Sequence, residues 1–354
     1  MTALSLVGLS VAMPSSAWTE RVKFKGDFRY RYEIIDQEGK DERHRNRIRL
    51  RIGFHAKVNE TLDVEAMLAS GGEDPVSTNQ SLDSQGTTKD IRIDQAYFAW
   101  KPASGLKIKG GKLKNPFYRP VKSELLWDGD LRPEGLVLQY DSGFFVNAGF
   151  FYIEERSKDD ESFLFGGQLG YKAKLGDGFK MTLGTGYFDY TEIKDRALTD
   201  FDYLEAEGDS FGNTLEDGHF VTDYNELEVF GDVTFKLGLP VSLFVDYVVN
   251  TAADDKVKDN DTGYLAGFKV GKAKEPGSWD FRYLYREIEA DALFGAFSDS
   301  DFIGGGTDGK GHEFNFGYQI AKGWKFGVSY FINDKGLEQE KDFERVQVDL
   351  KFKF

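Results

Sequence analysis

The sequence predicts an all-β protein: a transmembrane antiparallel β-barrel of about 16 strands, in a single domain over residues 18–354. Three observations lead to this fold class. Apolar and polar residues alternate with a period of two through most of the chain, which gives each strand two unlike faces. Short and long connections alternate between these segments, as they do in barrels that cross a bilayer. No run of about 20 apolar residues follows the N-terminal region, so a membrane-spanning helix is not expected.

The composition agrees with a β protein. The chain has 31 Phe, 17 Tyr and 40 Gly but only 8 Pro in 354 residues, which suits strands and tight turns. Cys is absent, which excludes disulfides, thiolate metal sites and Cys nucleophiles and fits an oxidising compartment. The formal net charge of -15 argues against nucleic acid as a partner.

The first 17 residues predict a secretory signal peptide. Residues 2–17, "TALSLVGLSVAMPSSA", are mostly apolar and end in the small residues Ser15, Ser16 and Ala17, so cleavage is expected after Ala17. No Lys or Arg precedes the apolar part, which points to a truncated or misplaced start. A short buried helix or strand is the alternative, but alternation begins abruptly at Glu20 and favours the signal peptide.

The first three strands show the alternation most clearly. In the strand expected over 20–35, Val22, Phe24 and Phe28 alternate with charged residues. The next strand, 45–58, reads "RNRIRLRIGFHAKV" and has a basic face and a continuous apolar face. Asn59 and Glu60 form a turn to the third strand, 61–69. An apolar row of this length needs a core or lipid, and a charged row needs water.

The same pattern continues to the C-terminus. The remaining strands are expected at 90–101, 105–112, 135–141, 143–154, 162–175, 178–190, 223–237, 240–251, 261–273, 278–290, 311–321, 323–333 and 342–354. An even number of strands lets the barrel close with both termini on the side of the short turns. The opposite end carries long connections rich in Asp, Gly and Ser, such as 191–222 and 291–310.

Aromatic residues fall at positions typical of membrane barrels. The last strand ends "RVQVDLKFKF", and its apolar row finishes at Phe354, which resembles the signal that such barrels present to their assembly machinery. Tyr97, Trp100, Trp279, Tyr285 and Trp324 lie near strand ends and are candidates for the aromatic girdles at the two membrane interfaces.

The alternation along the strands also predicts a basic wall inside the barrel, because every second residue faces the lumen. An Arg facing lipid at mid-membrane costs about 2–4 kcal/mol, so several Arg on one strand identify the face that lines the lumen. Acidic neighbours such as Asp27, Glu33 and Asp94 are expected to pair with part of this wall, leaving the rest to face solute. The basic wall is expected to comprise Arg29, Arg31, Arg47, Arg49, Arg51, Arg92, Lys107 and Lys109.

The most distinctive segment is 109–140, "KGGKLKNPFYRPVKSELLWDGDLRPEGLVLQY". It resembles the putative porin family of Gram-negative outer membranes, whose members carry a signature of the type "GK-x-KNPF … WDGD … PEG". The residues that match are Gly111, Lys112, Lys114, Asn115, Pro116, Phe117, Trp127, Asp128, Gly129, Asp130, Pro133, Glu134 and Gly135. The motif covers about a tenth of the chain, and the alternation extends the resemblance over the rest.

The resemblance implies an inward-folded constriction loop between the fifth and sixth strands, as in the general porins with their 16-stranded barrels. Composition supports this independently, because Phe117, Leu125, Leu126 and Trp127 need a surface to pack on. The alternative is a folded cap outside the barrel. The loop residues expected to act at the constriction are Lys114, Asn115, Pro116, Phe117, Arg119, Lys122, Glu124, Trp127, Asp128, Asp130, Arg132 and Glu134.

The resemblance implies a channel of the bacterial outer membrane for passive diffusion of small hydrophilic solutes and ions. Outer-membrane lipid, lipopolysaccharide and the barrel-assembly machinery are the expected partners, and a homotrimer is plausible by analogy with the general porins. Two alternatives remain: a substrate-selective channel for phosphorylated or carboxylated anions, and a non-channel structural or receptor barrel that binds in its outer loops. A soluble multistranded β protein is a further alternative, and it would be distinguished by its extraction without detergent.

No enzyme, cofactor or metal site is expected. The four His, at 44, 55, 219 and 312, do not stand at metal-ligand spacing, and no nucleophile–base or phosphate-binding motif is present. The predicted basic wall leads to one further expectation. The channel should prefer anions weakly, although the whole chain is acidic, because most of the acidic excess lies in outer loops such as 195–217.

Overall fold

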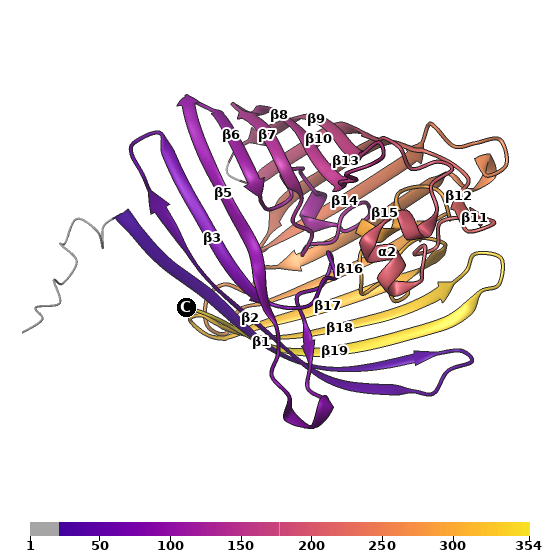
Figure 1. The fold of residues 1–354 in the computed structure, drawn as a ribbon. Coiled ribbons are helices and arrows are strands. Elements are labelled where there is room, and N and C mark those ends of the chain that lie inside the picture. The colour runs from indigo at the N-terminus through magenta and orange to yellow at the C-terminus, as the bar shows by residue number, and fades with distance from the viewer. Residues whose placement is uncertain (1–20, 177) are drawn as a thin grey trace, which may run out of the picture.

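The protein is described here from a computed structural model that covers residues 21–176 and 178–354. The expected signal peptide, residues 1–17, lies outside the described residues. Sixteen long antiparallel strands form a closed barrel, in which each strand pairs with the next along the chain and β1 pairs with β19 (Figure 1). The predicted fold class and strand number are therefore confirmed, and closure leaves no unpaired strand edge for lipid to meet.

The barrel strands differ from their predicted bounds by only a few residues. They are β1 (Val22–Gln37), β2 (Arg43–Lys57), β3 (Leu62–Ser70), β5 (Ile91–Ala103), β6 (Leu106–Lys112), β7 (Glu134–Asp141), β8 (Phe144–Glu154), β9 (Ser162–Leu175), β10 (Phe179–Tyr190), β13 (Tyr224–Leu237), β14 (Leu239–Asn250), β15 (Thr262–Gly271), β16 (Trp279–Ile288), β17 (Gly309–Ala321), β18 (Trp324–Lys335) and β19 (Lys341–Lys353).

Small elements occupy the long connections. A two-residue strand, β4 (Gln80–Ser81), pairs with β2 beyond the end of β3, and β11 (Leu215–Glu216) pairs with β12 (His219–Phe220). The one α-helix that the described residues contain is α2 (Asp202–Glu207), which lies with the long connections at one end of the barrel (Figure 1). None of the helices in residues 21–176 and 178–354 combines the length and apolar character needed to cross a membrane.

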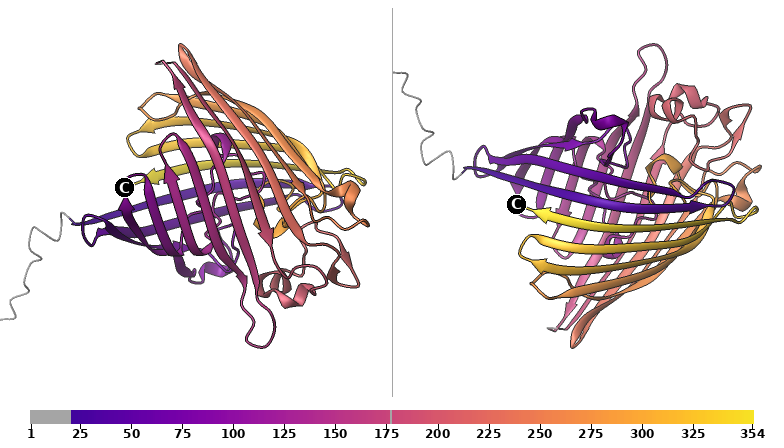
Figure 2. Two further views of the ribbon diagram at one scale, coloured as in Figure 1. Left: turned by 90° about the horizontal axis from the view of Figure 1, so that it is seen from above. Right: turned by 90° about the horizontal axis from the view of Figure 1, so that it is seen from below.

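The two ends of the barrel differ as the sequence predicted. Tight turns join strands at the end where the chain finishes, and the backbone N–H of Gly26 donates to Phe354 O there at 2.9 Å. The start of β1 therefore lies beside the C-terminus (Figure 2). The long connections 71–90, 113–133, 191–223 and 289–308 all belong to the opposite end.

The outer face of the barrel is apolar. Ile52, Leu136 and Val245 are 43%, 54% and 56% exposed, whereas inward-facing neighbours such as Val137 and Asp246 are buried. Trp100, Trp279 and Trp324 are also exposed on this face, as expected for girdle residues. Tyr97 is an exception to the prediction. It points into the barrel, because its neighbour Phe98 occupies the outer face of β5.

Three long connections fill part of the interior with an apolar core. Residues from 113–133, 191–223 and 289–308 pack together there, among them Trp127, Phe220 and Phe294, each no more than 2% exposed. The sequence had predicted 191–222 and 291–310 as outer loops. Acidic residues such as Asp202 are indeed exposed, but Asp291 and Asp299 are buried, and Phe and Leu residues of both connections pack inward on the barrel and on segment 113–133.

Candidate functional site: a basic cavity in the barrel

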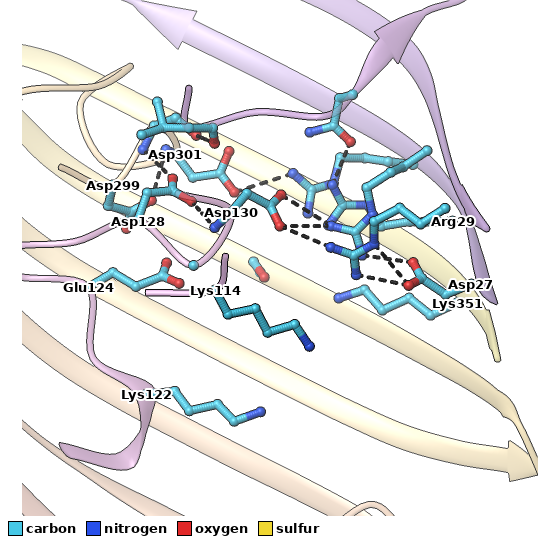
Figure 3. A pocket seen from close by; sticks show the side chains of 18 of the residues that line it. Asp27, Arg29, Lys114, Lys122, Glu124, Asp128, Asp130, Asp299, Asp301 and Lys351 are labelled. Atoms are coloured by element: carbon cyan, nitrogen blue, oxygen red, sulfur yellow. Dashed lines mark hydrogen bonds and ion pairs between the residues drawn. The ribbon is translucent and has the colours of Figure 1, made fainter. Parts of the chain in front are cut away.

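The interior space that the loops leave open lies against β1, β2 and β19. It forms a main cavity of about 780 Å³, bounded on the other side by segment 113–133 and by residues 299–301 (Figure 3). A second cavity of about 410 Å³ lies toward the long connections and is lined by residues such as Arg45, Arg47 and Tyr203. The two cavities share Val76 and Ser300 in their linings and are therefore neighbours.

Strand register brings the basic residues of the wall together. Arg29 of β1 lies opposite Arg49 of β2 on one side and opposite Lys351 of β19 on the other. Two residues further along the same face, Asp27 lies opposite Arg51, and the Asp27 carboxylate accepts a hydrogen bond from Arg51 Nε at 2.9 Å. Because side chains two residues apart share a face of a strand, all of these groups point into the barrel.

Ion pairs within the wall compensate some of these charges. Arg31 Nε donates to Asp349 Oδ1 at 2.8 Å, and Arg345 donates to Glu33 at 2.8 Å. Glu33 also pairs with Arg47 at 3.5 Å. The expected partial pairing of the wall with its own carboxylates is therefore seen in the geometry.

Two loops reach the same wall with carboxylates. Asp130 of segment 113–133 lies 3.2 Å from Arg49 and 3.3 Å from Arg51. Asp301 of connection 289–308 lies 3.3 Å from Arg31. Burial alone would raise the pKa of the Asp130 carboxyl, but the arginines around it hold that pKa well below its usual range. Both loops are thus held against the wall by charge-assisted hydrogen bonds.

The opposite edge of segment 113–133 is anchored on the far wall of the barrel. The Tyr118 backbone N–H donates to Gln168 Oε1 at 2.6 Å, and its hydroxyl donates to Asp232 of β13. Ser123 Oγ donates to Asp246 of β14 at 3.0 Å. The rings of Phe117 and Trp127 are stacked 5.9 Å apart in the apolar core. The segment therefore presents a polar edge to the cavity and an apolar edge to the core.

A cluster of carboxyl groups lies where the segment meets connection 289–308. Asp128 accepts hydrogen bonds from the backbone N–H of Asp130 at 2.6 Å and of Ser300 at 3.0 Å. Burial, together with the nearby Asp299, raises the pKa of Glu124 to about 7. Burial and Glu124 raise the pKa of Asp128 in the same direction. This part of the cavity therefore carries less negative charge at neutral pH than its composition suggests.

The structure places most of the sequence-predicted residues at these cavities. Arg47 lines the second cavity, and Lys107 lines a third, of about 370 Å³, together with Pro116 and Phe117. Trp127 lies in the apolar core and Lys109 lies beside the ring of Tyr97, 6.0 Å from its centroid. The predicted residues that line the main cavity are Arg29, Arg31, Arg49, Arg51, Lys114, Asn115, Arg119, Lys122, Glu124, Asp128, Asp130 and Arg132.

Two predicted residues lie elsewhere. Arg92 stands at the loop end of β5, half exposed, and pairs with Glu73 at 3.2 Å and with Asp90. Glu134 is the first residue of β7 and pairs with Lys112 at 2.7 Å. Neither residue belongs to the lining of the three cavities, because β5 and β7 begin at or beside these residues, at the rim of the barrel.

Other lining residues were missed from the sequence. Lys351 and Lys353 could have been found from the alternation, because they alternate with the apolar row of the last strand. Arg282 of β16 and Glu313 of β17 also alternate with aromatic neighbours. Asp299 and Asp301 carried no such signal, because their connection was expected to lie outside the barrel.

Basic residues outnumber acidic ones around the main cavity. The acidic ones are Asp27, Glu124, Asp128, Asp130, Asp299, Asp301 and Glu313. The basic ones are Lys25, Arg29, Arg31, Arg49, Arg51, Lys114, Arg119, Lys122, Arg132, Arg282, Lys351 and Lys353. The cavity is therefore positive, in a chain with a formal net charge of -15.

Comparison with known proteins identifies the class to which this barrel belongs. A family model described as putative porin matches residues 35–238 and 221–354. The chain therefore belongs to the putative porin family, and it is a porin of the bacterial outer membrane. The family and the fold are those of non-enzymatic channels.

Solved porin structures share the fold at low sequence identity. OprB of Pseudomonas putida, in its high-pH structure, superposes with a TM-score of 0.62 at 13% identity, covering 95% of each chain. OmpF of Salmonella typhi, in complex with daunomycin, gives 0.57 at 12% identity, covering 94% of this chain and 97% of that one. A mutant porin of Rh. blastica gives 0.55 at 12% identity, covering 94% and 100%. No curated protein matches this chain in sequence.

Proposed function

We propose that this porin forms a water-filled channel for passive diffusion of small hydrophilic solutes, with a preference for anions. The observation that carries the proposal is the basic lining of the main cavity. Charges at a narrow section with low-dielectric walls act through a focused field, whereas loop charges in water are screened over about 8 Å. The wall should therefore determine ion selectivity, and the acidic surface of the whole chain should not.

The preference should be moderate, because Asp27, Asp130 and Asp301 neutralise part of the wall directly. The remaining positive charge comes from residues such as Arg29, Lys114 and Lys353, which line the same space. In this proposal the narrowest section lies between the wall and segment 113–133, and small anions pass along the arginines of β1 and β2.

The test is a reversal potential measured in planar bilayers across a potassium chloride gradient. The wild-type channel should reverse on the anion-preferring side at pH 8 and low salt, and the preference should shrink in 1 M salt because exposed charges are screened more strongly there. A cation preference at low salt would refute the proposed role of the wall. A folded, inserted protein that conducts no ions would refute the open channel itself.

We also propose a homotrimer, and the lengths of the strands support it. A membrane-spanning strand tilted by about 45° needs roughly 9–11 residues. β6 has 7 residues and β7 has 8, whereas β1 has 16. A wall built from such short strands would be covered better by another subunit than by lipid. Chemical crosslinking in native outer membranes should give a three-subunit band, and a monomer alone would contradict the proposal.

Two further partners follow from the exposed ends of the barrel. Phe354 is 69% exposed beside Gly26, whose missing side chain leaves room for the aromatic ring, so it can present a terminal signal to the barrel-assembly machinery. At the other end, exposed carboxylates of 191–223, such as Asp202, would meet lipopolysaccharide through bridging divalent cations. Deleting Phe354 should lower the amount of assembled barrel without changing single-channel conductance.

A further inference from the structure

Four cations stand in one row across four neighbouring strands. Lys325 of β18 lies opposite Lys351 of β19, Lys351 lies opposite Arg29 of β1, and Arg29 lies opposite Arg49 of β2. Like charges directly opposite each other on a sheet repel and destabilise it. Such a row, here called the cation row, therefore requires compensating anions.

Three members of the cation row have their own carboxylates. Lys325 pairs with Asp280 at 3.1 Å, and Lys351 pairs with Asp349 at 3.0 Å. Arg49 pairs with Asp27 at 3.1 Å and with Asp130 at 3.2 Å. These carboxylates account for the charge of the row everywhere except at its centre.

Arg29 has no such partner among the residues that the structure describes. The side chain is 7% exposed, yet no carboxylate lies within ion-pair distance of it. Its Nη2 donates to the neutral amide oxygen of Asn79, and its Nε has no hydrogen-bond partner. A buried guanidinium with an unused donor is costly unless a counter-ion can reach it.

We propose that Arg29, flanked by Lys351 and Arg49, binds the phosphate group of a permeating solute. This inference rests on the proposed anion channel and names the class of anion that it would select. All three residues line the main cavity, and the Lys351 side chain is 40% exposed to it. A phosphate group carries close to two negative charges above pH 7 and three acceptor oxygens, which suit an Arg fork with a neighbouring ammonium.

A phosphate fits this position better than a carboxylate does. Bound there, a dianion would face the one uncompensated charge of the row and also Lys351, whose single carboxylate partner, Asp349, is shared with Arg31. Asp27 and Asp130 face the same space, but each already accepts from Arg49 and Arg51. A monoanion would offset the charge of Arg29 but would leave Lys351 with only its shared carboxylate, so it should bind more weakly.

The test measures chloride current through single channels at pH 8 with three added anions: inorganic phosphate, glucose 6-phosphate and acetate. Both phosphate probes should reduce the wild-type chloride current at concentrations at least tenfold lower than acetate needs. Block by inorganic phosphate alone would assign the site to the free ion, and block by both probes would assign it to phosphate groups in general.

Arg29→Gln should raise the half-blocking phosphate concentration at least tenfold. The matched control is Arg92→Gln, which removes the same charge at the barrel rim and should leave phosphate block unaffected. Arg29→Lys, which keeps the charge without the fork, should fall between wild type and Arg29→Gln. If Arg29→Gln does not insert, phosphate should still raise the thermal unfolding midpoint of wild type more than acetate does.

The failures are distinguishable. If the wild-type channel prefers anions but phosphate acts no differently from acetate, the site is refuted and the anion channel stands. If Arg29→Gln and wild type are blocked equally, phosphate acts elsewhere and the site is again refuted. A cation-preferring wild type would refute the proposed function and this inference together.

Discussion

At the scale of single residues, the sequence determines which face of the barrel a side chain occupies but not which group it meets. Arg49 and Arg51 were assigned to the lumen because a period of two leaves no other face for them beside Leu50 and Ile52. Their contact with Asp130 could not be predicted, because it depends on how a distant irregular segment crosses the barrel. Parity is a local property, whereas an ion pair between elements is not.

The raised pKa of Glu124 leads to a prediction about pH at this scale. The pKa of about 7 lies above the ordinary glutamate value, so the side chain is neutral below that pH and anionic above it. Lowering the pH from 8 to 6 should add positive charge to the cavity and shift the reversal potential further toward anions. Wild-type reversal potentials, recorded in a fixed chloride gradient across this pH range, check the prediction.

Variants assign the titration to this residue. Glu124→Gln should show the low-pH behaviour already at pH 8 and lose most of the pH dependence. Glu205→Gln, which alters an exposed residue of α2, should behave like wild type. Histidine is absent from the described lining of the main cavity, so no histidine there contributes to the change in reversal potential between pH 8 and pH 6. A pH dependence that survives Glu124→Gln would assign the titration to other groups.

At the scale of elements, alternation predicted strands well and loops poorly. All sixteen strands were found because each pairs with its neighbour in the chain and carries its own periodic signal. Connections 191–223 and 289–308 have no period, so their inward packing was missed. A weaker signal was present, because Phe201 and Leu204 stand among polar residues, Phe294 lies in the apolar run 292–297, and none of them has a reason to face water.

The packing of segment 113–133 predicts the effect of Trp127→Ala. Trp127 is 1% exposed, and its ring lies 5.1 Å from that of Phe188. Truncating a buried Trp costs about 3–5 kcal/mol, and here the loss falls on the docking of the segment rather than on the strand ladder. Single-channel records should therefore show larger and noisier open currents, while the thermal stability of the barrel in detergent changes little.

Trp100→Ala is the matched control, because Trp100 is 45% exposed on the outer face of the barrel. It removes the same side chain without touching the interior and should leave the open current unchanged. If Trp127→Ala inserts normally and conducts like wild type, segment 113–133 does not limit the channel, and the constriction must lie elsewhere along the interior.

At the scale of the whole molecule, the net charge of the chain and the positions of its charges predict opposite ion preferences. The chain is acidic overall, which alone suggests a cation channel, but exposed carboxylates such as Asp202, Glu205 and Glu207 lie on the long connections. The cavity itself is lined mainly by Lys and Arg. The sequence predicted this separation because the alternation along each strand distinguishes lumen positions from surface positions.

The replacement of Arg47, Arg49 and Arg51 together by Ser tests which set of charges controls selectivity. The change removes three cations, although Glu33 keeps its pairs with Arg45 and Arg345. It also takes away both arginine partners of Asp27 and two of those of Asp130. Both effects make the interior more negative, so the reversal potential should shift clearly toward cations.

The corresponding triple replacement by Lys keeps the three charges and loses only the two-pronged hydrogen bonds to Asp27 and Asp130. Its reversal potential should stay close to that of wild type, although looser docking of segment 113–133 should make its current noisier. The two triple variants thereby separate charge from geometry. If the Ser variant inserts and keeps the wild-type reversal potential, these arginines serve only to hold the segment against the wall, and selectivity must arise from Arg29, the lysines and the second cavity.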